Sequence, residues 1–217
     1  MRATLPLGVF MAFLLAGTTT SLKTTSVITF ISSNEMKIKE VKALLGDKTT
    51  FPYQLECKNF ELLEPQATPV EISRAKCAQA AQFVDGPVIV EDTSLHFNGM
   101  NGMPGPFVKF FYESMGNVGL AKMLDSFEDR SAYAQCVVSF THGVGQEIKT
   151  FVGVAEGTII KNPTEGMSKG FGWDPIFIPL GFDRPFGQME LEQKNQLSHR
   201  FKAFRELKGF LNSRTDG

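Results

Sequence analysis

The sequence predicts an α/β fold: a mixed twisted sheet flanked by helices, with two lobes around a central cleft. In the first half of the chain, β-branched apolar runs alternate with segments of helical periodicity. In the second half, residues 131–141 and 146–154 alternate apolar and polar side chains across a glycine-containing turn, which predicts an antiparallel hairpin. The cleft is expected between these two halves.

Composition narrows the class of protein. The chain has 217 residues, of which 42% are hydrophobic and 21% charged, and its formal net charge is −1. This indicates a globular protein with an ample core, and the near-neutral charge argues against nucleic acid as a partner. The three cysteines, Cys57, Cys77 and Cys136, are widely separated and lack metal-ligand spacing, so we expect free thiols. No internal repeat or low-complexity tract is visible.

The first residues form a separate N-terminal extension, 1–25, ahead of a domain at 26–217. Arg2 precedes an apolar run at 5–16 and then small and hydroxyl residues, which is the layout of a targeting signal. The run is short for a bilayer span. No membrane segment is expected in the mature domain. A secretory signal, the front of a two-part organelle address and an ordered extension all stay open.

The first strand and helix are predicted at 26–33 and 35–45. Ile38, Val41 and Leu45 form the helix's apolar stripe, and Gly46 ends it. The junction between them, Ser32-Ser33-Asn34, can cap the helix and direct backbone N–H groups at an anion, with Lys37 one turn later. A plain cap with a solvated lysine is the alternative.

Residues 51–63 are expected to hold one or two strands, followed by Glu64 in a proline-containing loop. Thr68, Pro69 and Glu71 then form a capping box that begins a helix. The core face of this helix is predicted to comprise Ile72, Ala75, Ala78 or Gln79, and Phe83. Lys76 lies one turn into the helix, and Gly86-Pro87 ends it.

The stretch 88–111 is the centre of the prediction. A buried strand ends at Glu91 and Asp92, and a Gly/Pro-rich loop leads into a Phe-rich helix that carries Lys109. Carboxylates at the carboxyl end of a strand are where open α/β sheets commonly perform chemistry. The alternative is a solvated strand end followed by a turn.

The rest of the chain completes the two lobes. A short helix is predicted at 118–124, and strands at 158–161 and 176–179. The connections 162–175 and 180–188 are expected to be loops. The final segment, 190–212, is predicted to be helical, with a buried stripe of Phe201, Phe204, Leu207 and Phe210 or Leu211.

The polar residues repeat one theme. The carboxylates Glu64, Glu91 and Asp92 accompany three lysines, and this mixture suits a magnesium-bound polyphosphate. Downstream, 171–175 (FGWDP) offers an aromatic face for a planar ring, and donors gather at the start of the last helix. Core packing of the aromatics and a capped, solvated helix start are the alternatives. The donors are Lys194, Ser198, His199 and Arg200.

These motifs, in this order and spacing, resemble the inosine triphosphate pyrophosphatase family from Ser26 to the C-terminus. The matching segments are Ser32-x-Asn34 with Lys37, Glu64 before the capping box, VEDT at 90–93, GMPGPFVK at 102–109, FGWDP at 171–175 and KNxxSHR at 194–200. Two positions depart from the pattern: Ser33 stands where the family often has Gly, and Gln193 where an acidic residue usually precedes the lysine.

The resemblance implies an enzyme that hydrolyses ITP, dITP and XTP to the monophosphate and pyrophosphate, clearing non-standard purines from the nucleotide pool. It implies Mg²⁺ as cofactor, with Mn²⁺ as a substitute, and a cytoplasmic homodimer, unless 1–25 directs the chain to a secretory or organellar location. Glu64 and Asp92 would hold the metal, and Asp92 would also be the catalytic base. The implied substrate-binding residues are Ser32, Ser33, Asn34, Glu35, Met36, Lys37, Lys76, Asp92, Thr93, Lys109, Phe171, Gly172, Trp173, Asp174, Lys194, His199 and Arg200.

Two other functions stay open. One is a related pyrophosphatase for modified pyrimidine nucleotides, as in the similarly folded septum-inhibitor family, although FGWDP and SHR argue against it. The other is a nucleotide-binding protein without hydrolysis, against which the intact carboxylates and lysines argue.

Overall fold

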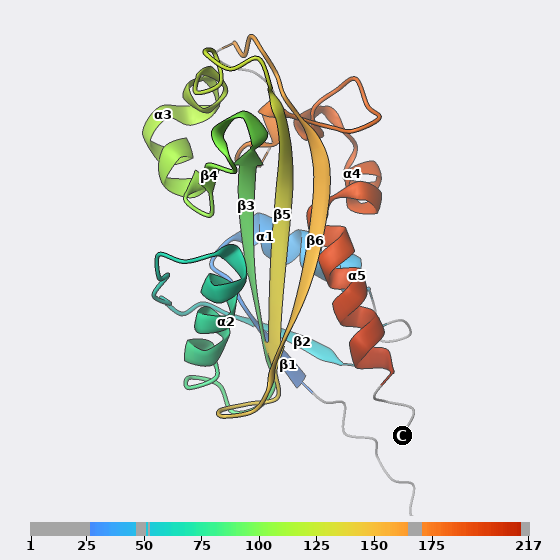
Figure 1. Ribbon diagram of the computed structural model, residues 1–217. Coiled ribbons are helices and arrows are strands. Elements are labelled where there is room, and N and C mark those ends of the chain that lie inside the picture. The colour runs from blue at the N-terminus through green and yellow to red at the C-terminus, as the bar shows by residue number, and fades with distance from the viewer. Residues whose placement is uncertain (1–26, 47–50, 52, 165–170, 214–217) are drawn as a thin grey trace, which may run out of the picture.

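The computed structural model describes residues 27–46, 51, 53–164 and 171–213, so the N-terminal extension predicted at 1–25 lies outside the described residues. Its central feature is a seven-stranded sheet in the order β2-β1-β3-β5-β6-β7, with β4 paired to β3 (Figure 1). The strands are β1 Val27–Ile31, β2 Gln54–Lys58, β3 Val88–Phe97, β4 Pro104–Gly105, β5 Ser131–Thr141, β6 Ile148–Ile159 and β7 Phe177–Pro179. The α-helices are α1 Glu35–Leu45, α2 Pro69–Ala80, α3 Val108–Lys122, α4 Leu191–Leu197 and α5 His199–Asn212.

The sheet is mixed, as predicted. β1 pairs in parallel with both β2 and β3, whereas β3, β5, β6 and β7 pair antiparallel in succession. Short 3₁₀ helices at Asn98–Met100, Asp174–Ile176 and Phe186–Gln188 lie in the connections. The long β3, β5 and β6 extend between both lobes of the molecule in Figure 1, with α3 at one end and α2 and α5 nearer the other.

Alternation along β3 distributes its side chains between two faces. Val88 and Val90 pack in a cluster with residues of α2 and the turn after it, whereas Ile89 packs in a cluster with α1 and α5. Further along the strand, Leu95 and Phe97 join a third cluster with α3 and the segment that follows residue 171. Three apolar clusters therefore surround the middle of β3, where its polar residues lie.

The position of Glu91 and Asp92 differs from the prediction. They lie in the middle of β3 and not at its end, because β5 pairs with β3 continuously from Val88 to Phe97. The parallel neighbour β1, however, pairs only as far as Val90. The carboxylates therefore follow the carboxyl end of β1, although their own strand continues.

Three other predictions on the strands and helices need correction. The strand predicted at 158–161 is the end of β6, because Thr158 still pairs with Ser131 of β5. The predicted terminal helix, 190–212, is interrupted at Ser198, whose extended backbone (ψ 154) ends α4 while its hydroxyl accepts from Phe201 N. Phe83 is 59% exposed and not a core residue, because α2 ends at Ala80 and the chain turns before it.

The local signals were otherwise reliable. Asn34 caps α1 and Gly46 ends it, and the Thr68–Glu71 capping box is present. Residues 51–63 hold one strand, β2, and the short helix predicted at 118–124 forms the second part of α3 after a break at Gly116 (φ 63). The three cysteines all fall within the described ranges and are free. Within those ranges, no helix is long and apolar enough to cross a membrane.

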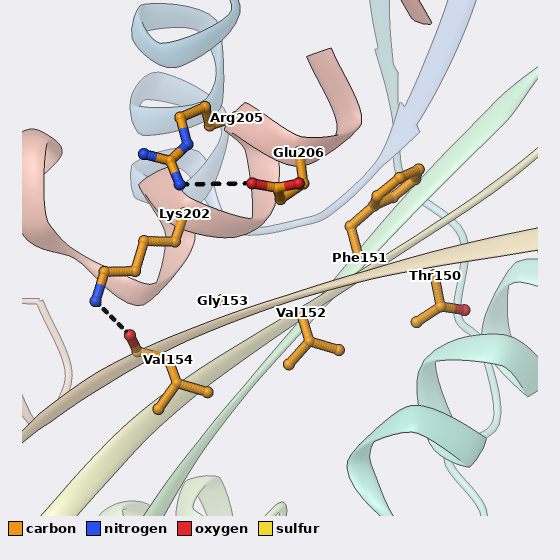
Figure 2. Close-up of a pocket in the computed structure, with 8 residues that line it drawn as sticks. All are labelled: Thr150, Phe151, Val152, Gly153, Val154, Lys202, Arg205 and Glu206. Carbon is orange, nitrogen blue, oxygen red and sulfur yellow. Dashed lines mark hydrogen bonds and ion pairs between the residues drawn. The ribbon is translucent and has the colours of Figure 1, made fainter. Parts of the chain in front are cut away.

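Helix α5 is held against β6 (Figure 2). A Cβ added at Gly153 would overlap the His199 carbonyl oxygen and lie 2.5 Å from the Ala203 nitrogen, so only glycine permits this approach. Lys202 Nζ donates to the Val154 carbonyl at 2.6 Å beside a shallow groove of about 440 Å³. The groove contains none of the predicted site residues, but the contact sets the position of the start of α5.

Candidate functional site

Most of the predicted site residues line one cleft of about 820 Å³. Strand β3 and the starts of α1, α3 and α5 contribute to it, together with α2, the loop before α2 and the segment 171–174. Of the described candidates, Glu35 and Met36 are exposed outside the cleft, and Lys194 and Ser198 are buried without lining it. The predicted residues in the lining are Ser32, Ser33, Asn34, Lys37, Glu64, Lys76, Glu91, Asp92, Thr93, Lys109, Phe171, Gly172, Trp173, Asp174, His199 and Arg200.

The junction between β1 and α1 has a defined shape. Asn34 Oδ1 accepts from the backbone nitrogens of Met36 and Lys37, each at 3.1 Å, and Ser32 Oγ accepts from the Asn34 nitrogen at 3.2 Å. The capping interpretation of this junction is therefore correct. The same loop also forms one wall of the cleft, which leaves the anion-binding interpretation compatible with its position.

Asp92 points toward α2 and is paired with Lys76. The Lys76 ammonium lies 2.5 Å from Asp92 Oδ1 and 2.6 Å from Glu64 Oε1, so it joins the two carboxylates. Burial raises the pKa of Asp92 despite this cation. For Glu64, burial is outweighed by the hydrogen bond and charge of Lys76, and its pKa is lowered. Asp92 Oδ2 is buried and has no hydrogen-bond partner among the described residues, so it is available to a ligand.

Glu91 occupies the opposite face of β3 from its neighbour. Its Oε2 lies 2.9 Å from Lys37 Nζ, and its Oε1 accepts from Thr93 Oγ1 at 2.5 Å and Arg200 Nη2 at 3.2 Å. Cys136 Sγ donates to the same oxygen at 3.3 Å. Burial would raise the pKa of Glu91, but the Arg200 and Lys37 charges hold it far below its usual range. Glu91 is therefore a charge-balancing residue, and Asp92 is the carboxylate open to chemistry.

A buried glutamate that sequence reasoning missed, Glu40, joins the two halves of the site. Its Oε1 lies 2.9 Å from Lys194 Nζ, and its Oε2 accepts from Arg200 Nη1. Lys194 also contacts Asp174 Oδ2 at 2.6 Å. Glu40 precedes Val41 of the apolar stripe, where a charged residue is normally solvated. No signal in the sequence marks its burial, because its partners lie more than 150 residues away.

His199 is a buried histidine on the wall of the cleft. Its ring lies 5.5 Å from that of Trp173, at 32°, and the residue is 2% exposed. Burial, followed by the charges of Arg200 and Lys194, holds its pKa well below the ordinary value, so the imidazole is neutral at pH 7. In the described part of the chain neither ring nitrogen has a hydrogen-bond partner, and the same is true of Arg200 Nε. These buried polar atoms can be satisfied by a ligand with its own donors and acceptors.

The carboxylates suit a hard cation. The described residues include no group of three His, Cys, Asp or Glu arranged as a metal site. Mg²⁺, however, is commonly held by only one or two carboxylates together with the phosphates of a substrate. Glu64 and Asp92 are two such carboxylates in one cleft, joined through the Lys76 ammonium, and they fit that requirement.

Comparisons with known proteins find relatives over most of the chain. The model of the Ham1 family matches residues 28–210. An inosine triphosphate pyrophosphatase from Ajellomyces capsulatus is 42% identical over 184 residues, which cover 85% of this chain and 96% of that protein. The structure of the Staphylococcus aureus Ham1 protein superimposes with a TM-score of 0.73 at 29% identity, and that of a HAM1 protein from Coxiella burnetii with 0.76 at 25%. Each alignment covers 87% of this chain and 100% of the other.

Proposed function

Because the chain belongs to the Ham1 family, we propose that it is a nucleoside triphosphate pyrophosphatase that hydrolyses ITP, dITP and XTP to the monophosphate and pyrophosphate. The 42% identical inosine triphosphate pyrophosphatase supports this class of reaction. The observation that carries the proposal is the set of side chains that line one cleft. Three lysines and the carboxylates of Glu64 and Asp92 lie along the same cavity as an aromatic wall and a neutral, unpartnered imidazole.

The lysines and carboxylates of the cleft suit a triphosphate. Lys37, Lys76 and Lys109 all line the cleft, and all three contribute to lowering the pKa of Glu64, so their charges act in the same region. Ammonium groups offset phosphate charge, and the Ser32–Lys37 junction offers further polar contacts. Glu64 and Asp92 would hold Mg²⁺, or Mn²⁺ in its place, which would neutralise phosphate charge and help to orient the substrate.

Asp92 is the proposed general base. Lys76 holds Oδ1 and leaves the buried Oδ2 free to accept a proton from a water molecule. The water oxygen forms a bond to the α-phosphorus as the anhydride bond between the α- and β-phosphates breaks, and the electron pair of that bond leaves with pyrophosphate. Lysine ammonium groups stabilise the charge that develops on the leaving group.

The aromatic part of the cleft suits the base. Hypoxanthine and xanthine carry a 6-keto acceptor where adenine carries a 6-amino donor. A neutral His199 can change tautomer and bond either, whereas Arg200 Nε can only donate. We therefore assign selection against adenine to the Arg200 donor, because a buried mismatch of two donors can discriminate by a factor of order 10⁴. Guanine also carries a 6-keto group, so this contact does not exclude GTP, and rejection of GTP would depend on the shape of the cleft around the 2-amino group.

The test is product analysis of the purified protein with Mg²⁺ and, separately, ITP, XTP, dITP, ATP and GTP. We expect pyrophosphate from ITP, dITP and XTP, and little product from ATP or GTP. Orthophosphate in place of pyrophosphate would contradict attack at the α-phosphorus. Tight binding of ITP without turnover would instead support the binding-only alternative, and preferential cleavage of modified pyrimidine nucleotides would support the related pyrophosphatase.

The family resemblance also suggests a homodimer in the cytoplasm. Sedimentation equilibrium would test the oligomeric state, and a monomer at micromolar concentration would contradict it. A fluorescent fusion with and without residues 1–25 would test whether the extension directs the protein elsewhere.

A further inference from the structure

His96, on β3, is not among the predicted site residues, but its side chain is buried and makes several specific contacts. It lies on the same face as Asp92, four residues further along the strand, and is 7% exposed. Its ring stacks on that of Tyr133, directly across the sheet, with centroids 4.4 Å apart and an interplanar angle of 4°. The ring is therefore held in one plane.

Both ring nitrogens of His96 are engaged. Nδ1 lies 3.0 Å from the Gly102 carbonyl oxygen, and Nε2 lies 2.8 Å from Ser94 Oγ. A carbonyl oxygen can only accept, so Nδ1 must carry the proton. Burial lowers the pKa of His96 despite the raising effect of the Gly102 bond, so Nε2 is unprotonated and accepts from the Ser94 hydroxyl.

The Gly102 bond fixes a loop that leads into the cleft. Backbone bonds between Phe97 and residues 102 and 103 close the base of this loop. The loop then returns along β3 as β4, which places Pro104 opposite His96, and delivers Pro106 and Lys109 to the cleft lining. Gly102 and Gly105 both have positive φ, and a Cβ at either would lie 3.4–3.6 Å from atoms of the His96 ring. The ring is thus packed against the loop as well as bonded to it.

We propose that His96 is a positioning residue for nucleotide binding: it ties the loop before Lys109 to the strand that carries Asp92. The proposal rests on the pyrophosphatase function proposed above. His96 does not line the cleft, so it acts through two residues that do, Ser94 on its own strand and Lys109 at the end of the loop.

Kinetics with ITP test this role. Loss of one buried hydrogen bond corresponds to a factor of about 10, so His96→Ala is expected to raise KM about tenfold, with a smaller change in kcat. In His96→Asn the amide nitrogen can take the place of Nδ1 and donate to Gly102, so we expect KM to return to within about threefold of wild type. The rescue would show that the higher KM of His96→Ala comes from the lost hydrogen bond to Gly102 and not from a general loss of packing.

Asn98→Ala is the matched control. Asn98 Nδ2 donates to Ser131 Oγ at 2.8 Å and holds the far side of the same loop without lining the cleft. We expect wild-type KM in this variant. An equal rise in KM for Asn98→Ala, a wild-type KM for His96→Ala, or a folded His96→Asn that is not rescued would each overturn the proposal.

The protonation of the His96 ring can be measured by NMR on the wild-type protein. This measurement needs no enzyme activity and does not depend on whether His96→Ala folds. In ¹⁵N-histidine-labelled protein, which has three histidines, the His96 signal is expected to show a proton on Nδ1 and none on Nε2. A neutral ring with its proton on Nε2 and none on Nδ1 would overturn the contact with Gly102. Absence of pyrophosphate release by wild type would refute the proposed function, whereas an active wild type with an equally efficient His96→Ala would refute only the role of His96.

Discussion

Glu40→Gln tests whether the buried charge network that joins the two halves of the site also stabilises the fold. Glu40 is 2% exposed and contacts both Lys194 and Arg200. A glutamine keeps the size and one acceptor oxygen, but it removes the negative charge and directs an amide donor at one of the cations. The substitution therefore isolates the charge from the packing.

The expected loss follows from the partners that remain. Removal of one member of a buried ion pair typically costs about 3–5 kcal/mol, because the other member is left uncompensated. Here Lys194 retains Asp174 at 2.6 Å, and Arg200 retains Glu91 at 3.2 Å. Neither cation is left alone, so we expect the lower end, about 3 kcal/mol. That loss is a large part of the free energy of unfolding of an ordinary domain, about 5–15 kcal/mol.

Urea unfolding at pH 7, followed by circular dichroism, measures this loss as a lower midpoint with an unchanged m-value. Glu206→Gln is the matched control, because it breaks a Glu–Arg pair of 3.5 Å that is largely exposed. We expect the control to cost less than about 1 kcal/mol. A cost for Glu40→Gln no greater than that of the control would refute the reasoning.

The pH dependence of the free energy of unfolding also tests the Glu40 pairing, because the direction of the change with pH can be predicted. Burial raises the pKa of Glu40, but the Arg200 and Lys194 charges outweigh it and leave the pKa below the ordinary value. A lowered folded-state pKa contributes stability that is present above the unfolded-state pKa and is lost as the pH falls through the folded-state value. The stability gap between wild type and Glu40→Gln should therefore narrow below about pH 4. A gap that stays constant or widens in acid would contradict the assigned pairing.

Three further outcomes are expected. Asp92→Asn should lower kcat for pyrophosphate release by about 10²–10⁴ while the urea midpoint stays near wild type, because asparagine keeps an oxygen for Lys76; an active variant would exclude Asp92 as the base. Lys109→Met should raise KM for ITP about tenfold or more with an unchanged unfolding curve, and an unchanged KM would exclude a phosphate contact. Gly153→Ala should destabilise by about 1–3 kcal/mol, seen as a lower thermal midpoint, because the added methyl group overlaps α5; an unchanged midpoint would contradict the close packing.

Much of the architecture could be predicted from the sequence. The cap at Asn34, the capping box at Thr68 and the hairpin that begins at Ser131 each depend on a few adjacent residues. Most of the candidate site residues also converge on one cleft, although Glu35, Met36, Lys194 and Ser198 do not line it. The convergence of the site residues follows from the family resemblance. The caps and the hairpin follow from interactions between residues that are close together in the sequence.

The predictions failed where an outcome depended on a distant segment. The strand end placed at Asp92 was wrong because β5 continues to pair with β3 as far as Phe97. Phe83 was wrongly assigned to the core because helical periodicity does not show where α2 stops. Neither error could be seen in the residues around it.

The sequence by itself determined which segments form helices and strands and which side chains are available for chemistry. Tertiary structure alone decided that adjacent Glu91 and Asp92 face different cations, that Glu40 is buried between Lys194 and Arg200, and that His96 holds Gly102. The physical reason is the distance along the chain over which each interaction acts. Caps and turns are short-range energies of neighbouring residues, whereas burial, ion pairing and pKa direction depend on which elements pack together in space.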